Sequence, residues 1–153
     1  MRKLRSLRAP AAGVALALGL VAATAAPALA ANRVEIYEAY YNSPGPDTGS
    51  NASLNAEWVQ LHNTSGARIS LTGWRLRDTA GHVFTFGPFT LGPYAFVKVH
   101  TGTGHGTSTD RYWCQHWYIW NNTGDHITLK YPTGSVVDYQ TYRGTSLGYV
   151  YFH

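Results

Sequence analysis

Disulfide bonds within the chain are excluded, because this 153-residue sequence contains a single cysteine, Cys114. The fold must therefore be held together by packing and hydrogen bonds alone. The lone thiol leaves two possibilities, a bridge that joins two chains in a homodimer or a buried side chain that acts as a small hydrophobe. We favour the buried side chain.

A large excess of positive charge is also lacking once the first 30 residues are set aside. The chain has 12 Lys and Arg against 8 Asp and Glu. Four of the basic residues (Arg2, Lys3, Arg5 and Arg8) and none of the acidic ones fall in that N-terminal segment. Twelve minus four leaves eight basic residues, which equals the eight acidic residues. Proteins that bind nucleic acid through phosphate contacts usually keep a basic excess. The sequence therefore argues against a nucleic-acid partner.

After residue 30 there is no apolar run long enough to span a bilayer. The apolar stretch at residues 11–26 follows the basic cluster, ends at Pro27 and precedes the small-residue site Ala28-Leu29-Ala30. That order predicts a cleavable signal peptide over residues 1–30. We expect the mature chain, residues 31–153, to be secreted as one domain with no membrane span after processing.

Helical periodicity is missing from the mature chain, and short segments rich in Val, Ile, Thr and aromatic residues recur between turn signals. We expect strands at residues 33–41, 57–63, 68–78, 82–86, 94–100, 126–131, 135–142 and 147–153. Residues 42–56 and 101–117 are expected to be long loops. The pattern predicts an all-β sandwich.

Residues 33–142 resemble the lamin tail domain, an immunoglobulin-like β-sandwich. The resemblance rests on NAEWVQLHNTSGARISLTGWRLRDTAGHVFTF, FTLGPYAFVKVHTG and WNNTGDHITLKYPTGSVVDYQTY. The positions that match the family pattern are Glu57, Trp58, Asn63, Gly73, Trp74, Asp78, Gly81, Trp120, Asn121 and Asp125. The resemblance implies a stand-alone exported module of the kind that bacteria place outside the cell.

Most of these family positions have a structural interpretation. We expect Trp74 to be the core tryptophan of the sandwich. A buried Glu57 would need a partner such as an Arg or a backbone amide. Side chains that fix turns by hydrogen bonding to the backbone are expected at Asn63, Asp78, Asn121 and Asp125.

The densest run of aromatic residues lies between 112 and 120. Trp and Tyr rings with polar tips are suited to stacking on sugars or anchoring a protein partner. The candidate ligand-binding residues are Tyr112, Trp113, Trp117 and Tyr118. The alternative for the tryptophans is that they close one end of the sandwich and fill its core, which we expect for Trp120.

Catalytic and metal-binding motifs are not evident. There is no G-x-S-x-G elbow, and the seven His residues lack zinc-site spacing. The arrangement that could form a metal site joins His100, His105, Asp110 and His116. We predict no catalytic residue, no cofactor and no bound metal.

Three functional hypotheses follow. The first is a secreted, non-catalytic binding or surface module that contacts a protein or a cell-envelope glycan. The second is a structural protein that self-associates through a sheet edge or through Cys114. The third is a metal-dependent hydrolase that uses the His100, His105, Asp110 and His116 group.

Overall fold

The computed structural model describes residues 33–153, so the predicted signal peptide lies outside the described residues. Within these residues the elements are β1 (Val34–Tyr40), α1 (Asn51–Asn55), β2 (Trp58–Asn63), β3 (Ile69–Ser70), β4 (Arg75–Arg77), β5 (Val83–Thr85), β6 (Thr90–Leu91), β7 (Phe96–His100), β8 (Asp110–Tyr112), β9 (Gly124–Lys130), β10 (Val136–Arg143) and β11 (Tyr149–Tyr151). In this part of the chain, no helix is long and apolar enough to cross a membrane.

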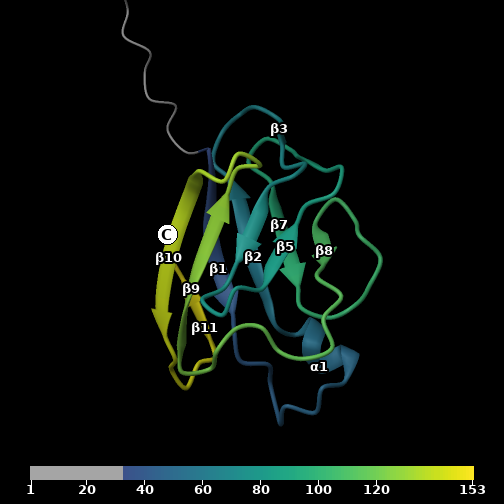
Figure 1. Cartoon of the computed structure of the whole chain (residues 1–153), viewed down its shortest axis with the longest axis vertical. Coiled ribbons are helices and arrows are strands. Elements are labelled where there is room, and N and C mark those ends of the chain that lie inside the picture. The colour runs from purple at the N-terminus through teal and green to yellow at the C-terminus, as the bar shows by residue number, and fades with distance from the viewer. Residues whose placement is uncertain (1–32) are drawn as a thin grey trace, which may run out of the picture.

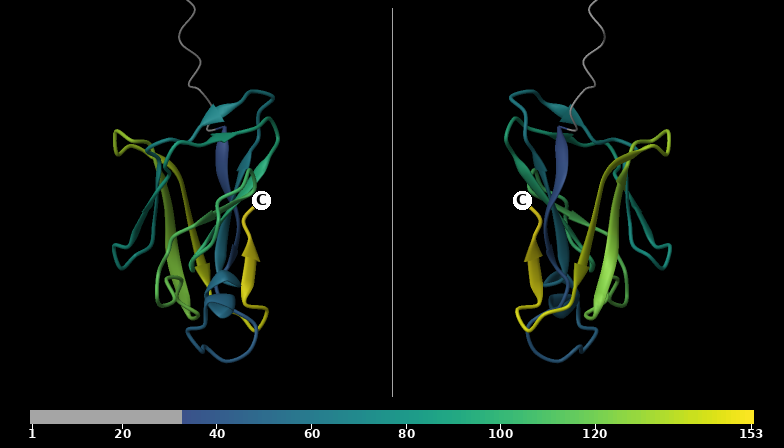
Figure 2. Two further views of the ribbon diagram at one scale, coloured as in Figure 1. Left: turned by 90° about the vertical axis from the view of Figure 1, so that its right-hand side faces the viewer. Right: turned by 90° about the vertical axis from the view of Figure 1, so that its left-hand side faces the viewer.

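The strands form two facing layers, seen edge-on in Figure 2. One layer is a five-stranded sheet in the order β11-β1-β2-β7-β8, and the other is a four-stranded sheet in the order β10-β9-β4-β5. Strands β3 and β6 pair separately, and α1 lies at one end of the sandwich (Figure 1). The prediction of an all-β, immunoglobulin-like sandwich is confirmed.

Alternating side chains explain why these segments form strands on two sides of one core. In β2, Val59 and Leu61 are fully buried, and their neighbours across the ladder in β7, Val97 and Val99, are buried as well. The residues between them point to the outer face, since successive side chains of a strand alternate. The inward residues of β9 complete the pattern from the opposite sheet.

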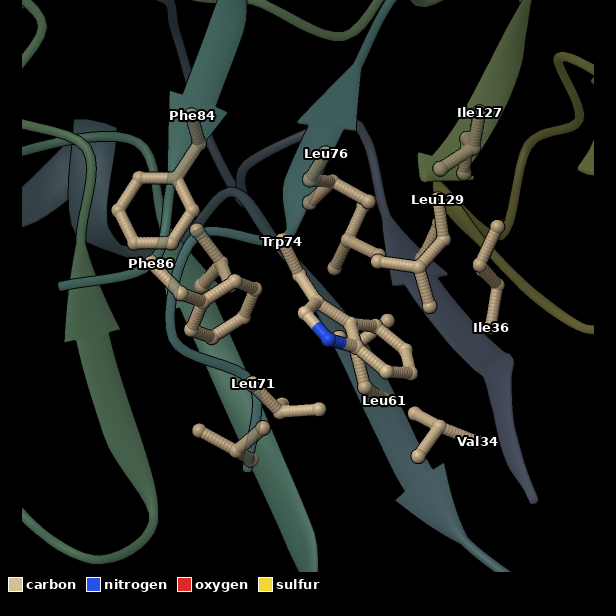
Figure 3. Packing of buried hydrophobic residues seen from close by; sticks show 14 of the residues in the cluster. Val34, Ile36, Leu61, Leu71, Trp74, Leu76, Phe84, Phe86, Ile127 and Leu129 are labelled. Carbon is tan, nitrogen blue, oxygen red and sulfur yellow. The ribbon is translucent and has the colours of Figure 1, made fainter. Parts of the chain in front are cut away.

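The core is built around Trp74, as Figure 3 shows. This side chain is 7% exposed, and its ring meets that of Tyr131 edge-on at 4.8 Å. The preceding residue, Gly73, has a φ of +79°, and a Cβ there would lie 3.2 Å from the Pro132 ring. The close approach and the positive φ explain a glycine beside the core tryptophan.

One polar contact joins the two layers. The Ile36 N–H donates to the Asp138 carboxylate at 2.7 Å. Both strands carry a register shift beside this contact, in β1 between Ile36 and Glu38 and in β10 between Val136 and Asp138. A bulge leaves backbone N–H groups of a strand without a partner in the neighbouring strand. The Ile36 N–H can therefore bind a carboxylate of the facing sheet.

The structure differs from the predicted strands and loops at four places, one of which is β6, a two-residue strand between the predicted strands 82–86 and 94–100. The predicted loop 42–56 contains α1, capped by the Ser50 hydroxyl, and the predicted loop 101–117 contains β8, which pairs in parallel with β7. Both elements are too short to show periodicity. The predicted strand 68–78 is divided into β3 and β4 by a turn closed by the Trp74 N–H and the Leu71 carbonyl at 2.9 Å.

Candidate functional site

The structure separates the four candidate ligand-binding residues. Trp113 is 7% exposed, and its ring contacts those of Phe84 at 5.8 Å and Trp120 at 5.9 Å. This packing leaves Trp113 no open ring for a ligand and makes it a core residue, as the alternative interpretation held. Tyr112 is the last residue of β8 and belongs to the five-stranded sheet.

Trp117 and Tyr118 lie on a surface loop that packs against the loop before α1. Trp117 is 62% exposed. The Tyr118 hydroxyl hydrogen-bonds to the Ser53 hydroxyl at 2.5 Å and accepts from the Gly49 N–H at 3.4 Å. These contacts fix the Trp117 loop on α1 and on the loop before it, although about 65 residues of sequence separate Tyr118 from Ser53.

Gly49 forms the support for the Trp117 ring. A Cβ at Gly49 would lie 2.8 Å from the Trp117 ring, and the backbone φ of Gly49 is +66°. Both observations require glycine here, because a side chain would displace the indole and strain the backbone. The backbone of one loop therefore holds the exposed ring of the other in place.

A shallow depression of about 350 Å³ lies beside these rings. It is lined by Asp47, Trp117, Tyr118, Ile119, Trp120, Asn121, Asn122 and Thr123. The volume lies at the lower end of the range for small-molecule sites. The depression combines an exposed indole with a carboxylate, amides and a hydroxyl, so it can stack on a flat ligand and hydrogen-bond to its rim.

A buried carboxylate holds the backbone beneath this depression. Glu57 is fully buried and accepts from the Thr101 hydroxyl at 2.6 Å and from the Ile119 N–H at 2.8 Å. Burial raises the pKa of Glu57 to about 7, against the lowering effect of these hydrogen bonds. The backbone amide is the kind of partner that the sequence suggested for this residue.

The polar family positions lie at strand ends or in the loops beside them. All of them except Asn121 bind backbone groups, as expected, whereas the Asn121 side chain binds the Asp125 carboxylate. Asp78 accepts from the Gly81 and His82 N–H groups at 2.8 and 2.7 Å. Asp125 accepts from the Thr79 N–H at 3.1 Å, and the Asn121 side chain donates to it at 3.1 Å. The Asn63 amide donates to the carbonyls of Ala67 and Gly92 at 2.7 and 2.6 Å.

These turns, the core tryptophan and the sandwich fit the sequence comparison. A profile described as Lamin Tail Domain matches residues 27–144. The chain belongs to the lamin tail domain family. A search of curated proteins gave no match. The family consists of immunoglobulin-like, non-enzymatic domains, which suggests a binding or structural role for this lamin tail domain.

The histidines considered for a metal site do not converge. His100 hydrogen-bonds through Nε2 to Asp110 at 2.9 Å and through Nδ1 to the Asn55 carbonyl at 2.8 Å. Hydrogen bonds from the Thr109 hydroxyl, the His100 ring and the Thr107 hydroxyl lower the pKa of Asp110, against the raising effect of partial burial. Among residues 33–153, no three His, Cys, Asp or Glu side chains are grouped so that they could hold a metal ion.

Cys114 is exposed, so the expectation of a buried thiol is wrong. The neighbouring Trp113 takes the core position, and the backbone turns at Cys114 with a φ of +60°. Its N–H donates to the Gly102 carbonyl at 3.0 Å. This turn places the thiol on the surface of the domain.

A second aromatic surface was missed by the sequence reasoning. In the five-stranded sheet, each strand places one aromatic residue opposite the next, and we call these residues the aromatic row. The row consists of Tyr149, Tyr40, Trp58, His100 and Tyr112. Ring centroids lie 5.5 Å apart for Tyr40 and Tyr149, 5.6 Å for Tyr40 and Trp58, and 5.1 Å for His100 and Tyr112.

A second row, two residues farther along each strand, is polar. This polar row consists of Tyr151, Glu38, Gln60, Lys98 and Asp110. The Lys98 ammonium lies 3.6 Å from the centre of the Trp58 ring, which links the two rows by a cation–π contact. Aromatic residues at outward positions of the expected strands were a visible signal, but only the register aligns them.

Proposed function

We propose that this lamin tail domain is a secreted, non-catalytic binding module that contacts a cell-surface glycan through the Trp117 depression. The observation that carries the proposal is the exposed indole held on Gly49 beside polar side chains. A sugar ring presents C–H groups on its face and hydroxyls around its rim. The indole would pack on the face, while Asp47 and Asn122 would bind the rim.

Fixed geometry supports recognition at this place. The hydrogen bonds of Tyr118 and Glu57 hold the loop before a ligand arrives, so less conformational entropy is lost on binding. The balanced charge of residues 31–153 favours a ligand other than nucleic acid. Tyr118 therefore serves to position the loop, and Trp117 serves to contact the ligand.

The test is a glycan array with the mature protein, followed by titration calorimetry on each hit. We expect Trp117→Ala to weaken binding by at least about tenfold, since buried aromatic anchors dominate binding energy. The matched control is Tyr94→Ala, which removes a 65% exposed aromatic residue just before β7. A hit that Trp117→Ala binds as tightly as the unchanged protein would refute this site.

Self-association is the second candidate function, and the exposed Cys114 thiol favours it. Two chains could join through this thiol under oxidising conditions, which an exported protein meets. Native mass spectrometry with and without reductant distinguishes the cases. A dimer that reductant or Cys114→Ser converts to monomer supports this function, and a monomer in every condition rejects it.

A further inference from the structure

The outer face of the five-stranded sheet carries an ordered chemical pattern that the core does not need. Its residues point away from the four-stranded sheet, which lies on the other side of the layer in Figure 2. The aromatic row and the polar row run side by side across all five strands. Beyond the polar row, Tyr37, His62 and Phe96 add three more rings in mutual contact.

We propose that this face is a second carbohydrate-binding site, which holds an extended neutral polysaccharide laid across the strands along the aromatic row. The site shares no residue with the Trp117 depression. Experiments on this face therefore test it separately from the function proposed above.

The dimensions of the face fit a chain rather than a single sugar. Five strands at about 4.8 Å spacing give the aromatic row a length of roughly 19 Å. Each of the five strands supplies one ring over this distance. Several linked sugar rings can therefore contact it at once.

The rings of the row are held in place without a ligand. Tyr40 lies between the rings of Tyr149 and Trp58, and His100 is fixed by Asp110 and by the Asn55 carbonyl. Each ring is partly covered by its neighbours and partly open to solvent. Such a surface loses little conformational entropy when it binds.

The two rows match the two kinds of surface of a sugar chain. The C–H groups of sugar rings pack on aromatic surfaces, whose π faces are electron-rich. The hydroxyls at the ring edges can reach the polar row, which lies about 7 Å away along each strand. Gln60 and Asp110 provide hydrogen-bond acceptors there and Lys98 provides a donor, whereas Glu38 is only 8% exposed.

The charges of the face select against other polymers. The partly exposed carboxylates of Glu35 and Asp110 lie on it with one ammonium, that of Lys98, and the carboxylate of Glu38 is buried within it. This balance repels an anionic polysaccharide or a nucleic acid. The centre of a protein interface is normally depleted of charged residues, whereas here charged side chains run through the middle of the face. A neutral glycan is the class that remains.

The test measures binding of neutral hexasaccharides of glucose and of N-acetylglucosamine, with polygalacturonate as the anionic probe, by titration calorimetry. The variants are Trp58→Ala at the centre of the row and Tyr112→Ala on the edge strand β8. The matched control is Tyr139→Ala, which removes a 50% exposed ring from the four-stranded sheet. Thermal melts establish that each variant is folded.

We expect at least one neutral hexasaccharide to bind, with affinity reduced at least about tenfold by Trp58→Ala and by Tyr112→Ala. Trp117→Ala and Tyr139→Ala should leave this affinity within about twofold. The proposal is overturned if no neutral hexasaccharide binds, if polygalacturonate binds more tightly, or if only Trp117→Ala reduces binding. A concentration-dependent dimer that Trp58→Ala dissociates would also overturn it, because a second copy would then cover the face.

Discussion

Two regions of this domain are rich in aromatic side chains, and the fold treats them in opposite ways. The residues from Tyr112 to Trp120 are adjacent in sequence, yet the structure distributes them among a sheet, the core and an exposed loop. The aromatic row is spread from Tyr40 to Tyr149, yet strand pairing brings it into one line. Closeness in sequence therefore did not predict a shared surface, and separation did not prevent one.

The largest expected effect is a difference in stability between substitutions at two tryptophans that lie four residues apart. Trp113→Ala removes a buried ring and should lower the free energy of unfolding by about 3–5 kcal/mol. Trp117→Ala removes a ring that is 62% exposed and should lower it by less than about 1 kcal/mol. Urea denaturation of both variants measures the difference. Equal losses would contradict the division of the aromatic segment into core and surface.

The next effect concerns the carboxylate under the Trp117 loop. Because the pKa of Glu57 is raised from 4.5 to about 7, its contribution to stability is full below pH 4.5 and is lost as the pH rises through 7. The loss amounts to roughly 3 kcal/mol. Comparing unfolding of the unchanged protein and Glu57→Gln from pH 4 to pH 9 isolates it, since the other titrating groups are common to both. Parallel pH profiles would show that Glu57 does not titrate in this way.

A smaller effect tests whether the aromatic row acts as a unit. The Tyr40 and Trp58 rings lie 5.6 Å apart, so a double-mutant cycle to Ala should give a coupling energy of about 0.5–1.5 kcal/mol. Tyr149 and Tyr112, at opposite ends of the row, should be additive within about 0.5 kcal/mol. Coupling confined to the distant pair would contradict the observed register.

The smallest effect is expected at Cys114. Because the thiol is exposed, Cys114→Ser should change the free energy of unfolding by less than about 0.5 kcal/mol under reducing conditions. The native protein should also react with a thiol reagent at a rate close to that of the unfolded chain. If the thiol became reactive only after unfolding, Cys114 would be buried, as the sequence suggested.

The sequence predictions were accurate where an element depends on interactions between residues close in sequence, and they failed where it depends on contacts between distant segments. The strands that form the pairs β4–β5 and β9–β10 were predicted because their turns and alternating residues are local signals. The short α1 and β8 were missed, since their few residues carry no period and their stability comes from contacts with distant segments. For the same reason the sequence grouped Trp113 with Trp117, because nothing local distinguishes a ring that faces the core from one that faces solvent.

The sequence by itself determined the class of fold, the family, the inward faces of the main strands and the core position of Trp74, because hydrophobic alternation and turn chemistry act over a few residues. Only the tertiary structure decided which aromatic residues share a surface. The support of Trp117 by Gly49, the hydrogen bond from the Ile119 N–H to Glu57 and the alignment of five rings across one sheet all depend on contacts between distant segments. For the five rings the strand register decides the outcome, because a shift of one residue would turn each side chain of a strand to the opposite face.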